Sequence, residues 1–171
     1  MPRNHMILCI MITLLSGCAS TFIGSYKVPQ DGPVAELTVK DDTYLDISQL
    51  IRYKEARDCS GGMTEMLKDE MVESGGSRVT MVPAGKPLAF YIVGYHRSMG
   101  RVKSCGILSE FTPVAGQKYL LMFSTLKEHC TLEIHKQTAE SDEFIADPTH
   151  IIRKRNEEAY WNTDPHCYPK T

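Results

Sequence analysis

The cysteines of this chain are the residues whose number and spacing point most clearly to chemistry. The 171 residues include six cysteines, which are Cys9, Cys18, Cys59, Cys105, Cys130 and Cys167. A thiol can carry a lipid, form a disulfide or bind a metal. No Cys-x-x-Cys pair is present, so the spacing indicates neither a thioredoxin-like redox pair nor a zinc knuckle. The spacing therefore favours covalent attachment and crosslinking.

Other polar residues could do chemistry only if folding brings them together. The candidates are His96 with Ser98, Glu133 with His135 and the nearby His129, Asp41 with Asp42, and His166 beside Cys167. Short spacing along a chain does not make a catalytic triad, and His166 with Cys167 would bind a metal only through a free thiol. No hydrolase, nucleotide-binding, zinc-protease or EF-hand motif is present. The sequence predicts no catalytic residue, no metal and no cofactor.

Cys18 ends a short apolar segment at the start of the chain. Arg3 and His5 precede the ten residues from Met6 to Leu15, and Ser16 and Gly17 then lead to Cys18. A cationic start, a short apolar core and small residues before a cleavage point are the parts of a secretory leader. The apolar run is shorter than the roughly 18 residues that a membrane-spanning helix needs.

Leu15-Ser16-Gly17-Cys18 resembles the lipobox of bacterial lipoproteins. The resemblance implies a signal peptide over residues 1–17, a diacylglyceryl group on the Cys18 thiol and a fatty acid such as palmitate on its new amine. Ala19 stands where aspartate commonly retains Gram-negative lipoproteins in the inner membrane. Alanine there implies the outer membrane, which we expect the protein to join at its periplasmic face. A plain leader cut near Ala19 is the alternative.

The other cysteines of the mature chain predict two disulfides, because exported chains meet an oxidising compartment. Four cysteines allow three connectivities. We favour Cys105–Cys130 with Cys59–Cys167. If consecutive strands form two hairpins, Cys105 and Cys130 both lie opposite Ser124. That places them two strands apart, about 9.5 Å, so a bulge or an early strand end has to bring them within reach of a disulfide.

Composition predicts one domain and argues against nucleic-acid binding. The net charge is −2, and the basic cluster at 153–155 is followed at once by Glu157 and Glu158. Because the two glutamates follow so closely, we interpret that cluster as a solvated helix face. Nucleic-acid binders carry a basic patch or stripe, and this sequence has no such stripe. The expected organisation is a signal peptide over 1–17, a lipidated N-terminus and tether over 18–33, and a single domain over 34–171.

Alternating and continuous apolar patterns predict about seven strands. They cover residues 35–40, 44–53, 78–82, 88–95, 105–111, 119–124 and 130–137. The run at 88–95 is nearly all apolar or aromatic, as expected of a central strand covered on both faces. Residues 96–103 are polar and contain glycine, so they are expected to form a loop.

Two segments have helical patterns. Met63, Met66 and Met71 lie near helical spacing in the 60–73 region, which indicates a short amphipathic helix. Its methionines could form a soft binding surface, although packing on the sheet is the more common role. Asp147-Pro148 is a favourable helix start, so a C-terminal helix is expected from there, followed by a coil from Trp161.

The fold class expected from these elements is mainly β: an antiparallel β-sandwich of the immunoglobulin or transthyretin kind, with the two helices added. A closed barrel would give a similar pattern.

The functional expectation is a non-enzymatic, lipid-anchored envelope domain that binds or scaffolds an envelope protein. The N-terminal lipid is expected to bind the membrane. The candidate contacts with the protein partner are Met63, Met66, Met71, Tyr160, Trp161 and the 96–103 segment. Size, anchor and fold class are similar in a general way to the lipid-anchored sandwich subunit of type VI secretion, so a subunit of an envelope assembly is a second hypothesis. A hydrolase with dispersed residues is a third.

Overall fold

The computed structural model describes residues 24–43, 45, 47–66, 75–98, 101–126, 129–156 and 166–168. Eleven strands occur there and no helix. The strands are β1 Gly24–Ser25, β2 Val34–Asp42, β3 Ile47–Glu55, β4 Ser60–Glu65, β5 Ser77–Pro83, β6 Leu88–Ser98, β7 Arg101–Phe111, β8 Lys118–Leu126, β9 His129–Gln137, β10 Phe144–Ala146 and β11 Ile151–Ile152. The prediction of a mainly β chain is therefore confirmed.

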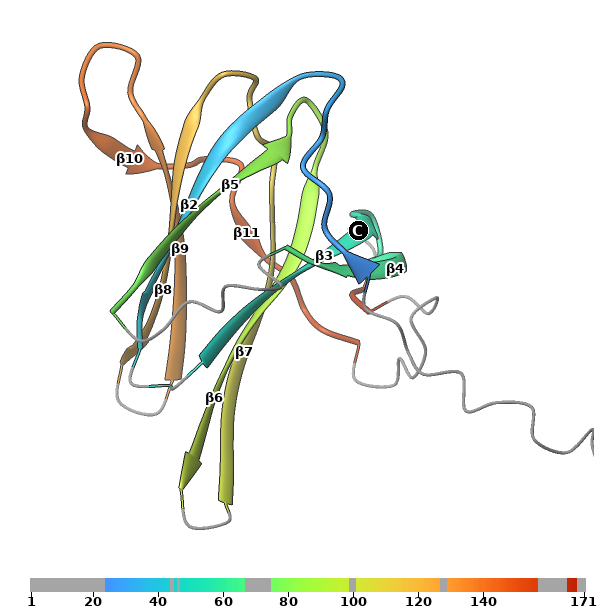
Figure 1. Ribbon diagram of the computed structural model, residues 1–171, viewed down its shortest axis with the longest axis vertical. Coiled ribbons are helices and arrows are strands. Elements are labelled where there is room, and N and C mark those ends of the chain that lie inside the picture. Colours follow the sequence, from blue (N-terminus) through green and yellow to red (C-terminus); the bar gives the residue numbers. More distant parts are fainter. Residues whose placement is uncertain are drawn as a thin grey trace, which may run out of the picture.

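The strands form two sheets (Figure 1). One has the order β1-β4-β3-β6-β7-β11 and the other the order β10-β9-β8-β2-β5. The expectation of purely antiparallel sheets is wrong, because β2 runs parallel to β8 and β1 runs parallel to β4. The chain leaves β2, forms β3 and β4 in the other sheet and returns as β5, so β8 arrives later at the free edge of β2.

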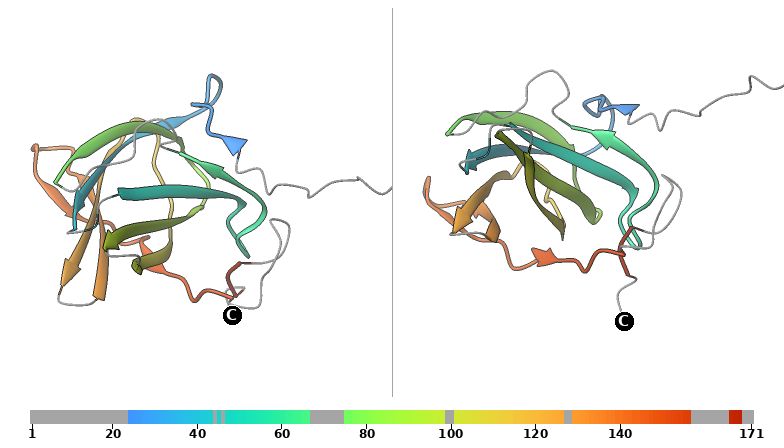
Figure 2. Two further views of the ribbon diagram at one scale, coloured as in Figure 1. Left: turned by 60° about the horizontal axis from the view of Figure 1, so that its bottom comes forward. Right: turned by 90° about the horizontal axis from the view of Figure 1, so that it is seen from below.

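The two sheets curve around one interior (Figure 2). A single core cluster takes side chains from both, among them Leu37, Phe90, Ile92, Leu121 and Ile134. Three aromatic rings cross the interface: Phe90 meets Phe111 at 6.1 Å between centroids, and Phe111 meets Tyr119 of the opposite sheet at 5.1 Å. Edge-to-face contacts of this kind add to the roughly 1.5–3 kcal/mol that burial of each large side chain contributes.

Strand β6 is covered on both faces, as its apolar sequence predicts. Phe90 points into the main core, whereas Ala89 belongs to a second cluster on the outer face of the six-stranded sheet. That second cluster also contains Tyr53, Leu108 and the Cys59–Cys167 disulfide.

The helix expected over 60–73 is wrong where the structure describes it. Residues 60–65 are β4, which pairs antiparallel with β3. Cys59, Gly61 and Gly62 have φ angles of 58°, 76° and 100°, so the chain turns sharply just before and within this strand. The free edge of β3 offers backbone partners to the incoming segment, and this non-local pairing outweighs the local spacing of the methionines. Residues 67–74 lie outside the described part.

The C-terminal helix is also absent from residues 147–156. Asp147 accepts hydrogen bonds from the Thr149 amide and hydroxyl, which makes a turn rather than a helix cap. Ile151 and Ile152 then pair with β7 as β11. Residues 157–165 lie outside the described part. The 96–103 loop is shorter than expected, since β6 and β7 continue to Ser98 and Arg101.

Both predicted disulfides are confirmed, but the register argument for one of them is wrong. Strands β7 and β8 belong to different sheets, and Cys130 lies opposite Thr125 rather than Ser124. Cys105–Cys130 therefore crosses between the sheets, with its Cα atoms 6.0 Å apart. Cys59–Cys167, at 5.4 Å, ties the end of the chain to the β3–β4 turn.

Removing either disulfide should destabilise the fold by an amount that follows the length of chain that it closes. The bridges span 108 and 25 residues. Loop-closure entropy then predicts about 5 kcal/mol for Cys59→Ala/Cys167→Ala and about 3.5 kcal/mol for Cys105→Ala/Cys130→Ala. Urea unfolding of both double variants, with the unreduced parent as control, measures the difference. Equal losses, or a larger loss for the shorter loop, would contradict this order.

Candidate functional site

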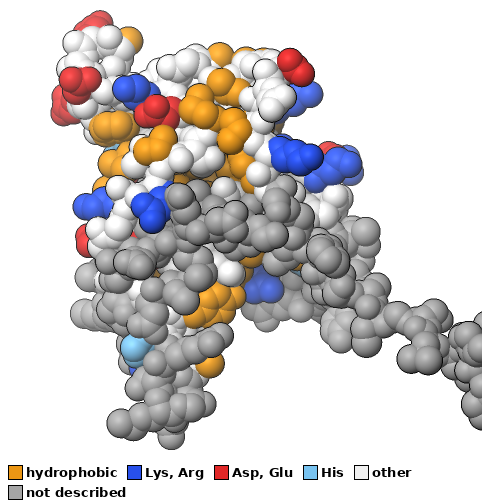
Figure 3. All heavy atoms as spheres, in the orientation of Figure 1, with side chains coloured by type: hydrophobic (Ala, Val, Ile, Leu, Met, Phe, Trp, Pro, Cys, Tyr) orange, Lys and Arg blue, Asp and Glu red, His pale blue; other side chains and the backbone are white. Residues whose placement is uncertain are grey.

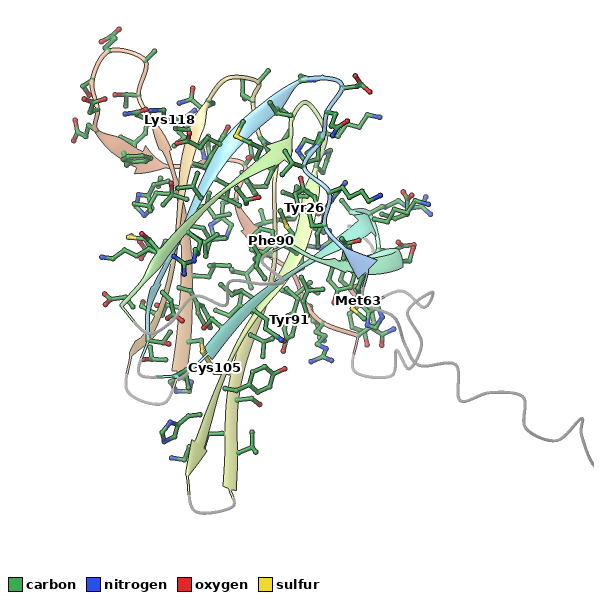
Figure 4. The ribbon with its side chains drawn as sticks, in the orientation of Figure 1. Tyr26, Met63, Phe90, Tyr91, Cys105 and Lys118 are labelled. Atoms are coloured by element: carbon green, nitrogen blue, oxygen red, sulfur yellow. A yellow bond between two sulfur atoms is a disulfide. The ribbon has the colours of Figure 1, made fainter. Side chains whose placement is uncertain are left out.

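The predicted site residues do not converge on one place. Met66 is 5 % exposed in the main core, and Met63 packs half-buried against the second cluster, on the same side of the sheet as Tyr91 (Figure 4). Their burial leaves little methionine surface for a partner. Cys18, Met71, Tyr160 and Trp161 lie outside the described residues, so their roles remain predictions.

The polar candidates have structural partners. The Glu133 carboxylate lies 2.9 Å from His135 Nε2 on an outward face of β9, and His129 is exposed at the start of that strand. Within the described ranges, no group of three or more histidine, cysteine, aspartate or glutamate residues could hold a metal ion. Buried Asp41 accepts the Thr43 amide at 2.8 Å, whereas Asp42 is exposed.

The remaining candidate pairs, His166 with Cys167 and His96 with Ser98, also have structural surroundings. Cys167 is disulfide-bonded, and the neighbouring His166 ring lies 5.4 Å from the Tyr53 ring. His96 lies on β6 opposite Lys103, in the register that continues to Ser98.

The structure brings together a serine and a histidine that are 41 residues apart in the sequence. No sequence motif predicts this contact. His150 Nε2 lies 2.8 Å from Ser109 Oγ, and Asp147 precedes His150 on a turn. The Ser109 hydroxyl donates to the carbonyl of Ile151 at 3.1 Å. A hydroxyl has one proton, so His150 Nε2 must donate to Ser109 rather than accept from it. Ser109 is also wholly buried. This arrangement fastens β11 to β7 and does not activate a nucleophile.

A buried ion pair holds the end of the chain to the outer face of the six-stranded sheet. Arg153 and Glu110 pair with side chains only 5 % and 4 % exposed. The same guanidinium donates to the carbonyls of Ala56 at 3.3 Å, Arg57 at 2.8 Å and Tyr168 at 2.6 Å. We call this set the Arg153 cluster. The interpretation of residues 153–155 as a solvated helix face is wrong for Arg153, because one cation here satisfies three carbonyls and a carboxylate.

A surface pocket of about 380 Å³ opens beside the Arg153 cluster. Its lining includes the exposed cations Lys54, Arg57 and Lys86, with Glu55 and the buried Glu110. Because Arg153 neutralises Glu110, the lining carries an excess of positive charge. The pocket could accept a small anion such as a carboxylate or phosphate, although it presents no reactive group.

Tyrosines line the outer face of the six-stranded sheet next to this region. The Arg155 guanidinium lies 5.1 Å from the centre of the Tyr91 ring and donates to its hydroxyl at 3.4 Å. Tyr91 itself lies across Gly106, where any Cβ would overlap the ring. Burial raises the pKa of Tyr53 to about 12, with Arg155 opposing the shift and Tyr91 adding to it. Half-buried Tyr91 and Tyr95 extend this surface toward the end of the β6–β7 hairpin.

The opposite sheet presents an apolar surface. Hydrophobic side chains gather over β2 and β5 in Figure 3, and Val79 of β5 is 61 % exposed. In register, Val79 and Thr38 share a row with Leu120 of β8, so two apolar side chains flank Thr38 on this face. The described part of the chain contains no helix long and apolar enough to span a membrane.

Breaking the Arg153 cluster should cost stability. Glu110→Gln leaves a buried cation without its counter-charge, and Arg153→Met leaves a buried carboxylate and three carbonyls without their donor. We expect losses of about 3–5 kcal/mol in the free energy of unfolding, with Arg153→Met the larger. Lys154→Met, at the exposed neighbouring position, is the matched control and should change stability by about 0.5 kcal/mol or less. A neutral Arg153→Met variant would contradict the assignment.

The partial burial of His150 should make stability depend on pH. Burial lowers the pKa of His150 below its ordinary 6.5, the Asp147 and Glu133 carboxylates oppose the shift, and His135 adds to it. As pH falls through 6.5, the unfolded chain gains a proton that the folded chain resists, so stability decreases with acidification. Urea unfolding from pH 8 downward should show a flatter profile for His150→Gln than for the parent. Parallel profiles would exclude His150 as the source.

Comparison with known proteins assigns the chain to no family. No protein-family model matches it, and neither does any curated protein or solved structure. A function for the chain therefore has to rest on its own residues and fold.

Proposed function

We propose that this chain is a lipid-anchored protein of the cell envelope whose folded body works by binding another envelope component. The two disulfides are the observation that carries the proposal. Both join segments from different parts of the fold and close long loops. Disulfides of this kind persist in oxidising compartments and are rare in the cytosol, so they agree with export directed by residues 1–17.

The anchor is the second part of the proposal. A single acyl chain holds a protein at a membrane only marginally, whereas several chains hold it stably. A triacylated Cys18 would therefore keep the domain at the outer membrane, and residues 18–33 would serve as the lipidated N-terminus and tether.

Binding rather than catalysis is proposed because of what the described side chains are placed to do. In the Ser109–His150 pair the histidine donates rather than accepts the proton, and the Ser109 hydroxyl is closed to solvent. The pocket beside the Arg153 cluster offers charge without a nucleophile or an acid–base pair. The described surface also includes tyrosine, cationic and apolar areas, which suit contact with a partner protein.

We also propose the finer fold class, a β-sandwich of the immunoglobulin or transthyretin kind. One core shared by two sheets and a disulfide between their strands support it. Domains of this class often present their edges and loops as binding surfaces on a rigid body.

Fatty-acid labelling tests the anchor. In Gram-negative cells fed labelled palmitate, the parent chain should carry the label and sediment with outer membranes, whereas Cys18→Ser should lose both properties. Cys9→Ser changes the other cysteine of the leader and should behave as the parent. Ala19→Asp should keep the label and move to the inner membrane. Label retained by Cys18→Ser would contradict the proposal.

Crosslinking in the same cells tests the binding half. The anchored parent should give a discrete adduct of higher mass with a membrane-permeable crosslinker. Cys18→Ser, released from the envelope, should give less of it. An anchored protein that gives no adduct would contradict a binding role and leave the anchor intact.

A further inference from the structure

The β6–β7 hairpin extends beyond the rest of its sheet. Strand β3 pairs with β6 only as far as Ile47 opposite Tyr95, whereas β6 and β7 stay paired to Ser98 opposite Arg101. Figure 1 shows this hairpin reaching well past the other strands. Residues 96–98 and 101–103 thus form a two-stranded projection that pairs with no further strand among the described residues, which we call the basic hairpin.

The basic hairpin is cationic without acidic residues. It contains Arg97, Arg101 and Lys103, with His96 as a fourth basic residue. No aspartate or glutamate stands anywhere between Glu73 and Glu110, although the whole chain has a net charge of −2. Positive charge is therefore concentrated at the far end of the molecule, where it acts over about a Debye length, ~8 Å at physiological ionic strength.

A disulfide holds the basic hairpin where it leaves the sheet, which we call its root. Cys105 lies opposite Gly94, one residue inside the point where β3 stops pairing, and it bonds to Cys130 of the other sheet. A crosslink at that position limits how far the hairpin can swing. Rigidity lowers the entropy that a binding contact must overcome, so the projection is built to present its charge rather than to fold back.

Basic residues occupy register positions on both faces of the ribbon. In register, His96 lies opposite Lys103, Arg97 opposite Val102, and Ser98 opposite Arg101, and opposed residues share a face of the sheet. Basic positions thus occur on either face. A protein pocket or groove usually contacts one face, whereas a diffuse anionic surface can surround an inserted tip. Val102 is 62 % exposed among these cations, and Lys103 is exposed beside it.

We propose that the basic hairpin is a docking element for a membrane surface rich in anionic lipid headgroups. Basic residues bind the phosphates, and Val102 contacts the boundary between headgroups and acyl chains. The inference rests on the proposed envelope location, which supplies such a surface. An acyl anchor restrains position but not orientation, whereas a second, electrostatic contact fixes which face of the domain points away from the membrane.

Vesicle binding by the chain without its lipid tests this element. The mature chain carrying Cys18→Ser is mixed with vesicles of phosphatidylcholine alone or mixed with phosphatidylglycerol. We expect binding only to the anionic vesicles, and loss of that binding at 1 M salt, where the Debye length falls to about 3 Å. Each cation near an anionic surface is worth about a fivefold change in partition, so Arg97→Gln/Arg101→Gln/Lys103→Gln should weaken binding roughly 100-fold.

A matched variant separates position from total charge. Lys54→Gln/Arg57→Gln/Lys86→Gln removes the same three charges from exposed positions elsewhere on the molecule. It should reduce vesicle binding only a few-fold. Equal losses for the two triple variants would overturn the proposal, since net charge alone would then explain the binding. Far-ultraviolet circular dichroism and thiol titration confirm that each variant is folded and oxidised.

A single-stranded DNA oligonucleotide, used as a polyanion without a lipid surface, distinguishes the source of the phosphate. We expect a Val102→Ser variant to lose vesicle binding and to bind the oligonucleotide as the parent does. A chain that prefers the oligonucleotide to anionic vesicles, or whose vesicle binding ignores Val102→Ser, overturns the lipid assignment. Because the assay omits the acyl chains, its failure leaves palmitate labelling of Cys18 unaffected, and the failure of that labelling leaves the vesicle result unaffected.

Discussion

The outer face of the six-stranded sheet must be covered, and the chain covers it with its own C-terminal segment. Strand β6 carries apolar side chains toward both faces, so one sheet-to-sheet interface is not enough. Arg153 provides the link: its guanidinium pairs with buried Glu110 and donates to carbonyls from the β3–β4 turn and from Tyr168. A buried charge is tolerated only when such partners are supplied, so the segment has one place in which it can lie.

The two disulfides hold different parts of the fold together. Cys59–Cys167 closes the cover over the second cluster, and Cys105–Cys130 joins the sheets beside the root of the basic hairpin. Neither pair belongs to adjacent strands of one sheet, so backbone hydrogen bonds alone do not hold these segments together. A small two-sheet body gains stability from covalent links of this kind, because they restrict the unfolded chain.

Local charge says more about this surface than net charge does. The chain is slightly acidic as a whole, yet it has a long acid-free stretch that spans β5, β6 and most of β7. Folding places the basic hairpin, which belongs to that stretch, beyond the rest of its sheet, and it places Lys86 at a pocket with Lys54 and Arg57. Two cationic areas of different shape result, a concave one suited to a small anion and an extended one suited to a surface.

The sequence by itself determined the β class, most strand positions and the covered central strand β6, because alternation and apolar runs report burial directly. Its two helical patterns failed at 60–65 and 147–156. Helical spacing is a local signal, and the open edges of β3 and β7 offered those segments backbone partners from far along the chain.

Only the tertiary structure decided which strands are neighbours. The strand neighbours in turn decided which role individual residues have. The register of a presumed β7–β8 hairpin pointed to the correct Cys105–Cys130 bond for a reason that the separate sheets remove. Arg153, Ser109 and His150 gained their roles from partners more than 40 positions away. Contacts at such separation depend on how sheets stack, which no residue spacing encodes. A lipid anchor at Cys18, by contrast, is predicted from four adjacent residues alone and stays a prediction.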